Sequence, residues 1–134
     1  MRTLISSALA LMAITGTAHA NWSYVGSAPD PNMQVYIDLD RVTSNGSEKT
    51  AWMLFDFAQT QTDQATGRYA HLSVIEQDII ECSNGTIQGS TQILYAGNMG
   101  AGSVVSTIPA PASIKGSPIV PGSMWDTARG KVCP

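Results

Sequence analysis

A hairpin pattern between residues 33 and 60 constrains the fold more than any other feature of the sequence. In Met33–Val42 (MQVYIDLDRV), apolar side chains occupy every second position from Val35 to Leu39. A period of two is typical of a strand with one buried face. Asn45-Gly46 then signals a hairpin turn in which both residues take positive φ. Thr50–Thr60 (TAWMLFDFAQT) returns as a long apolar strand with both faces at least partly covered, so we expect it near the centre of an antiparallel sheet.

The rest of the chain repeats this alternation of strands and turns. Strands are predicted at 22–27, 68–82, 86–97 and 103–107, with a second hairpin turn at 83–85. In the longest of them, Glu76 and Asp78 fall on the apolar side. We expect a β-bulge near Glu76 to Asp78 to restore the apolar phase of the strand, and we expect the two acids to lie on a solvated face. Residues 108–123 are rich in Pro, Gly and Ser and should be irregular.

One helix is predicted, at the end of the chain. Ser123 can cap it, and Asp126 follows three residues later, which is the spacing of a capping box. Trp125, Ala128 and Val132 lie at helical spacing and form a single apolar stripe. A helix this short needs tertiary support. The predicted fold class is therefore α+β: an antiparallel sheet of about six strands flanked by a C-terminal helix.

The two cysteines supply a further constraint. Cys82 and Cys133 can form only one intramolecular bond, and an exported chain meets an oxidising compartment. We therefore expect a disulfide that ties the helix to the sheet. For a closed loop of this length, the chain-entropy model gives roughly 4 kcal/mol of stabilisation.

The first twenty residues (MRTLISSALALMAITGTAHA) have the form of a signal peptide: a basic start, an apolar run and a small-x-small end. The prediction is a leader at 1–20 and one domain at 21–134, exported to the periplasm or cell surface. No Cys near the cleavage point provides a lipid anchor, and no later segment is apolar enough for an integral membrane helix. Without Arg2, six basic and ten acidic residues remain, a balance that argues against binding to nucleic acid.

Ala96–Val105 (AGNMGAGSVV) contains three glycines and could be mistaken for a phosphate-binding loop. A strand-like segment follows it where a phosphate site needs a helix, so we interpret it as a bend between strands. His71 has no motif that would supply a nucleophile or an orienting acid. Asp38 and Asp40 share one side of a strand, and we expect a solvated face there. The sequence thus predicts no catalytic residue, no metal site and no cofactor.

The chain resembles the bacterial surface-adhesin protein E family. The matching segments are WSYVGS, VYIDLDRV, AWMLFDF, Glu81-Cys82, YAGNMGAGSVV, SPIVPGS and the final Cys133. The resemblance implies an antiparallel sheet with a disulfide-fastened C-terminal helix. It also implies a surface or periplasmic binding protein, in some members an adhesin for host extracellular-matrix proteins and in some a dimer.

The predicted function is non-enzymatic binding of a protein partner, with a host matrix protein as the candidate. Trp22, Tyr24 and Tyr36 are candidate contact residues, because aromatic side chains are favoured at the centres of interfaces. Two alternatives remain open. One is a small-ligand protein or enzyme that uses His71 with a carboxylate such as Glu76 or Asp78. The other is a structural homodimer of the envelope, built by pairing strand edges.

Overall fold

The computed structural model describes residues 20–29, 31–63, 66–109 and 116–134. The predicted leader, apart from Ala20, lies outside the described residues. The strands are β1 (Trp22–Ala28), β2 (Met33–Asn45), β3 (Glu48–Gln61), β4 (His71–Glu81), β5 (Thr86–Tyr95), β6 (Val104–Pro109) and the two-residue β7 (Ser117–Pro118). A 3₁₀ turn, η1 (Asn98–Gly100), precedes β6, and helix α1 (Met124–Val132) follows β7.

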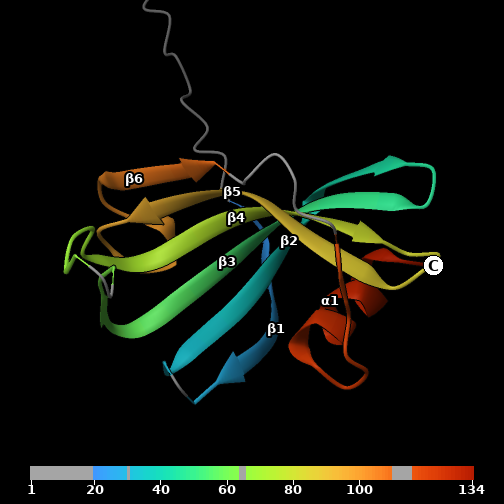
Figure 1. Ribbon diagram of the computed structural model, residues 1–134, viewed down its shortest axis with the longest axis horizontal. Helices are drawn as coiled ribbons and strands as arrows, with labels where there is room; N and C mark the ends of the chain where they lie inside the picture. Colours follow the sequence, from blue (N-terminus) through green and yellow to red (C-terminus); the bar gives the residue numbers. More distant parts are fainter. Residues whose placement is uncertain (1–19, 30, 64–65, 110–115) are drawn as a thin grey trace, which may run out of the picture.

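The main path of the sheet is an antiparallel meander in the order β1-β2-β3-β4-β5-β6, with β7 paired to β5. Each strand of this path lies beside its neighbour in the sequence, and α1 packs against one face near β1 and β2 (Figure 1). The predicted fold class is confirmed: an antiparallel sheet with six strands on its main path, a C-terminal helix and one disulfide. The first hairpin differs in detail, because its turn residues are Gly46 and Ser47, and of these Gly46 has positive φ (61°).

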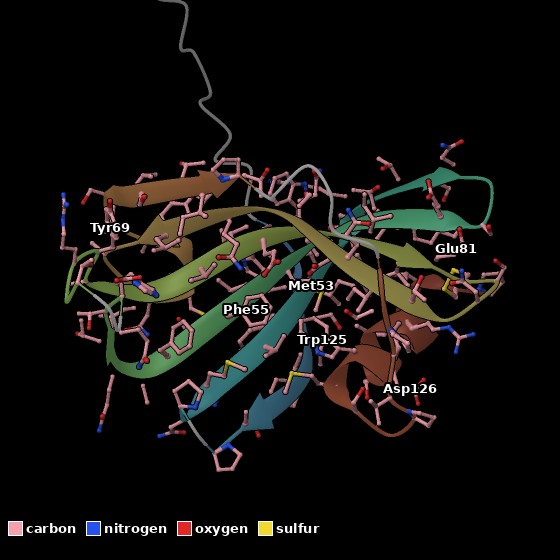
Figure 2. All side chains as sticks on the ribbon, viewed as in Figure 1. Met53, Phe55, Tyr69, Glu81, Trp125 and Asp126 are labelled. Atoms are coloured by element: carbon pink, nitrogen blue, oxygen red, sulfur yellow. A yellow bond between two sulfur atoms is a disulfide. The ribbon has the colours of Figure 1, made fainter. Side chains whose placement is uncertain are left out.

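The hydrophobic core lies between the sheet and α1. Alternate residues of β2 and β3 supply most of it, and Met53 and Phe55 lie beside Trp125 of the helix in Figure 2. The rings of Phe55 and Trp125 are 5.7 Å apart between centroids. The buried core residues are Val25, Val35, Ile37, Ala51, Met53, Phe55, Phe57, Val74, Leu94 and Ala128. We call this side of the sheet the helix face and the opposite side the open face.

The helix begins as predicted. Ser123 is the N-cap, and its Oγ accepts a hydrogen bond from the backbone N–H of Asp126 at 3.3 Å. The Asp126 carboxylate accepts from the N–H of Gly122, one residue before the position that a standard capping box uses. Trp125, Ala128 and Val132 form the stripe that packs on the sheet. The sequence pattern therefore located both the start and the buried side of α1.

The disulfide between Cys82 and Cys133 joins the turn after β4 to the residue that follows α1, with 5.7 Å between the Cα atoms. Arg129 supports the same junction, since its guanidinium donates to the backbone carbonyl of Cys82 at 3.2 Å. Both ends of the helix are therefore held, one by its cap and the other by a covalent bond. Within the described part of the chain, no helix is long and apolar enough to cross a bilayer.

Candidate functional site

The open face carries two rows of large side chains that the strand register places side by side. In the first row, Trp22 of β1 lies opposite Asp38 of β2, which lies opposite Trp52 of β3. In the second, Tyr24 pairs with Tyr36, and the row continues across the sheet through Leu54, Ile75 and Ile93. Cross-strand neighbours of this kind have their Cβ atoms about 5 Å apart. The antiparallel meander thus collects aromatic and branched residues from five strands onto one surface.

A hollow of about 520 Å³ lies on this face. Trp22 and Trp52 form part of its wall, and Tyr95 from the end of β5 contributes a third aromatic ring. The full lining is Ala20, Trp22, Arg41, Trp52, Ile75, Ile93, Tyr95, Met99 and Gly100. Hollows lined mainly by apolar and aromatic groups, with a few polar ones, are the usual form of binding sites.

Asp38 and Arg41 supply the charge at this hollow. Asp38 is fully buried between the two tryptophan positions, whereas the Arg41 side chain is 52% exposed. Arg41 Nε lies 3.3 Å from Asp38 Oδ2, and Asp38 Oδ1 accepts from the N–H of Asp40. The expectation that Asp38 lies on a solvated face is therefore wrong. The pairing of β2 with β3 shifts register between Asp38 and Thr43. Arg41 lies in this irregular stretch, and its side chain reaches the carboxylate of Asp38.

The glycine-rich stretch closes one end of the hollow. It is a bend between β5 and β6, as predicted, and Met99 has a φ of 55°. Asp56 of β3 accepts from the backbone N–H of Met99 at 2.6 Å, and the buried Ser73 of β4 accepts from that of Gly100 at 2.9 Å. These bonds attach the bend to the sheet. As a result, the partly exposed Met99 side chain lies at the border of the hollow.

The three predicted contact residues, Trp22, Tyr24 and Tyr36, all lie on the open face. Tyr24 and Tyr36 meet edge to face, with ring centroids 5.7 Å apart, and Tyr24 is 52% exposed. Sequence reasoning missed Trp52 and Tyr95. The alternation around Trp52 does place it on the same face as Leu54. Its neighbours across the sheet, however, depend on register, which the alternation does not give.

His71 does not meet the carboxylates proposed as its partners. Its Nδ1 lies 2.6 Å from the carbonyl oxygen of Tyr69, and its ring packs against Phe57. Glu76 instead accepts from the side-chain amide of Gln92 at 3.1 Å. Among the described residues, His71 forms no hydrogen bond or ion pair with Glu76 or Asp78. The general-base arrangement that the enzyme alternative requires is therefore not formed by these groups.

The two acids in the middle of β4 differ from their expected placement. Glu76 lies opposite Gln92 and Asp78 opposite Gly89, so β5 carries the extra residue of the bulge. Because β4 itself stays in phase, both acids remain on the helix face with Val74. Burial is the main cause that raises the pKa of each, and the charge of Glu76 helps to raise that of Asp78 to about 8. At the end of the same strand, hydrogen bonds from Ser47 and Ser83 lower the pKa of the half-buried Glu81.

The described residues contain no group of three or more His, Cys, Asp and Glu side chains that could hold a metal ion.

The sequence profile of the family named Surface-adhesin protein E matches residues 22–134. The chain belongs to that family. A comparison with curated proteins gives no significant match.

Solved structures of Haemophilus influenzae protein E share the fold. The selenomethionine form is 16% identical, with a TM-score of 0.59 and 92% of each chain covered. Protein E from non-typeable Haemophilus influenzae is 15% identical, with a TM-score of 0.55, covering 91% of this chain and 80% of the other. At these sequence identities, the similarity shows a shared fold, that is, the same arrangement of strands and helix, and nothing more.

Proposed function

We propose that this member of the surface-adhesin protein E family is a non-enzymatic binding protein that contacts a protein partner through the open face. The observation that carries the proposal is the aromatic hollow with the Tyr24–Tyr36 pair beside it, on the side of the sheet away from α1. Aromatic side chains at a partly exposed surface provide large contact area at a low cost in side-chain entropy. Family membership supports adhesion as the biological role, with a host extracellular-matrix protein as the partner.

The proposal includes export. The segment at 1–20 acts as the signal peptide, and the domain at 21–134 functions in the periplasm or on the cell surface. Fractionation of cells, followed by protease treatment of intact cells, tests this step. Cleavage of the protein on intact cells supports surface display, and protection from protease in an intact periplasm rules surface display out.

The binding step is tested with immobilised laminin, vitronectin and fibronectin. Trp22→Ser and Tyr24→Ser each remove an aromatic contact from the open face, and we expect at least a tenfold loss of affinity for the matrix protein that binds. Val120→Ser is the matched control, since Val120 is 67% exposed and lies in the segment before α1. Absence of saturable binding to any matrix protein would refute the host-matrix proposal.

The homodimer remains an alternative use of the same fold. The outer edges of β1 and β6 end the main path of the sheet, and an unpaired edge can accept a strand from a second copy. Gel filtration with light scattering distinguishes the two. Monomer at high concentration excludes the dimer, whereas a dimer that keeps matrix binding shows that both functions coexist on separate surfaces.

A further inference from the structure

A second, smaller hollow lies on the helix face, away from the surface proposed for the protein partner. Its volume is about 180 Å³, and Phe55, Phe57 and Val74 form its apolar part. Glu76 and Gln92 supply its polar end. Gln92 donates its side-chain amide to Glu76 Oε2 at 3.1 Å, which fixes the orientation of the carboxylate. A charged carboxylate at the end of an aromatic and aliphatic hollow is costly, and either a bound proton or a neighbouring cation lowers that cost.

The other oxygen of Glu76 points into the space beside Gly89. A Cβ atom at position 89 would collide with Glu76 Oε1 and would lie 3.4 Å from Asp78 Oδ1, so both carboxyl groups converge where the side chain is missing. Asp78 is only 2% exposed, and its Oδ2 has no hydrogen-bond partner. Among the described residues, no Lys, Arg or His forms an ion pair with either acid. Lys49, a lysine of the neighbouring strand β3, donates instead to Ser44.

The chemistry of these groups selects one kind of ligand. A metal ion would find only two carboxyl groups, fewer than the six to eight oxygens that Ca²⁺ takes. A guanidinium group binds best to both oxygens of one carboxylate, and here Gln92 already donates to Glu76 Oε2. An ammonium group is compact, and its three donors can turn toward separate oxygens, such as Glu76 Oε1 and an oxygen of Asp78. The methylene stem of an alkylamine would pack on the apolar part of the hollow, as lysine stems do on apolar surfaces.

We propose that this hollow binds the ammonium group of an alkylamine at Glu76, with Asp78 behind it and the stem on Phe55, Phe57 and Val74. The source of the amine is either a lysine side chain of a peptide or a free diamine, and both present the same chemistry. The proposal goes beyond the partner-binding function, because it uses residues of the other face of the sheet. Failure of one therefore leaves the other standing.

The test is an NMR titration of the ¹⁵N-labelled full domain with three probes. Nα-acetyl-lysine amide represents a peptide side chain, 1,5-diaminopentane represents a free amine, and Nα-acetyl-norleucine amide is the uncharged control. We expect one or both amines to shift the side-chain amide of Gln92 and the backbone N–H of Phe55, with norleucine leaving both unchanged. Equal shifts from norleucine, or no shift from either amine, would overturn the proposal.

Variants separate a specific site from general attraction of cations to an acidic protein. Glu76→Gln should weaken amine binding at least tenfold, whereas Glu48→Gln, an exposed acid at the start of β3, removes the same charge and should leave affinity unchanged. Gly89→Ala keeps every charge but displaces Glu76, and it should also weaken binding at least tenfold. Amide dispersion in the spectrum of each variant verifies that it folds. Equal loss in the Glu76 and Glu48 variants would overturn the proposal.

Discussion

The two faces of the sheet carry similar apolar and aromatic side chains, but these side chains have different roles. On the helix face, alternate residues of β2 and β3 are buried under α1, and a disulfide joins the end of α1 to the turn after β4. On the open face, the intervening residues include aromatic groups that stay partly exposed and surround a hollow. The adjacent residues Met53 and Trp52 mark the contrast, because the first is fully buried and the second lines the hollow. Stability is concentrated on one face, which leaves the other available for binding.

The largest effect should follow from removing the disulfide. Replacing Cys82 and Cys133 by Ser should lower the free energy of unfolding by roughly 4 kcal/mol, because the unfolded chain regains the freedom of a long loop. Urea denaturation followed by circular dichroism measures the loss. If the open face does not depend on the disulfide, the folded variant should still bind the matrix partner. A change below about 1 kcal/mol would contradict the assignment of stability to the helix face.

The second prediction compares neighbouring residues of β3. Met53→Ala should cost about 3 kcal/mol, since it leaves a cavity in the core. Trp52→Ser should lower stability less than Met53→Ala, but it should weaken partner binding at least tenfold. Denaturation and solid-phase binding of the same two proteins provide the measurement. Equal destabilisation by the two substitutions would show that the open face is also a structural core.

The third prediction concerns pH and the helix face. The pKa of Asp78 is raised from 3.8 to about 8, so between these values the folded protein binds a proton that the unfolded chain releases. Stability from this group is therefore complete below about pH 4 and is lost as the pH rises toward 8. Asp78→Asn removes the linkage and should raise the unfolding free energy at pH 8, with a smaller gain at pH 4.

Neighbouring charges define the control for that experiment. Glu76, whose pKa burial also raises, remains in the variant and keeps a weaker slope of the same sign. Glu81→Gln, at the last residue of the same strand, should leave the decline toward pH 8 in place. Thermal unfolding from pH 4 to 8 distinguishes the variants. A wild-type protein that becomes more stable across this range would contradict the buried, uncompensated state of Asp78.

The smallest effect should come from the helix cap. Ser123→Ala removes the acceptor for the Asp126 N–H and should cost about 1 kcal/mol. Ser123→Asp restores an acceptor and should recover most of the loss. Native-state hydrogen exchange should show faster exchange in the first turn of α1 in the Ala variant, with β3 and β4 unchanged. Uniform loss of protection across the sheet would mean that α1 and the sheet unfold as one unit.

Local chemistry made much of the fold predictable. The period of two around Val35–Leu39 located β2, Gly46 located its turn, and Ser123 located the start of α1. The cysteine pairing followed from there being only two thiols. The strand, turn and helix signals depend on residues close together in the sequence. The disulfide depends on the number of cysteines, because two cysteines allow only one pairing.

The sites were less predictable because they depend on register. The pairing of β4 with β5 shifts register between Glu76 and Asp78, where a bulge was expected, but the extra residue lies in β5, so both acids stay on the helix face. Likewise, Trp22, Tyr24 and Tyr36 were selected as aromatic residues, while the hollow that joins Trp22 to Trp52 and Tyr95 required their cross-strand partners. Register is fixed by pairs of strands together, so reading one strand at a time could not recover it.

The meander has a consequence for the order of folding. Every pairing along its main path joins consecutive strands, so the sheet can grow by adding one neighbouring strand at a time. The packing of α1 on β1 joins segments at opposite ends of the domain and carries a larger entropic cost. We therefore expect a folding intermediate in which the sheet is formed and α1 is not yet docked. Trp125 would report the final step, the docking of α1 on the sheet.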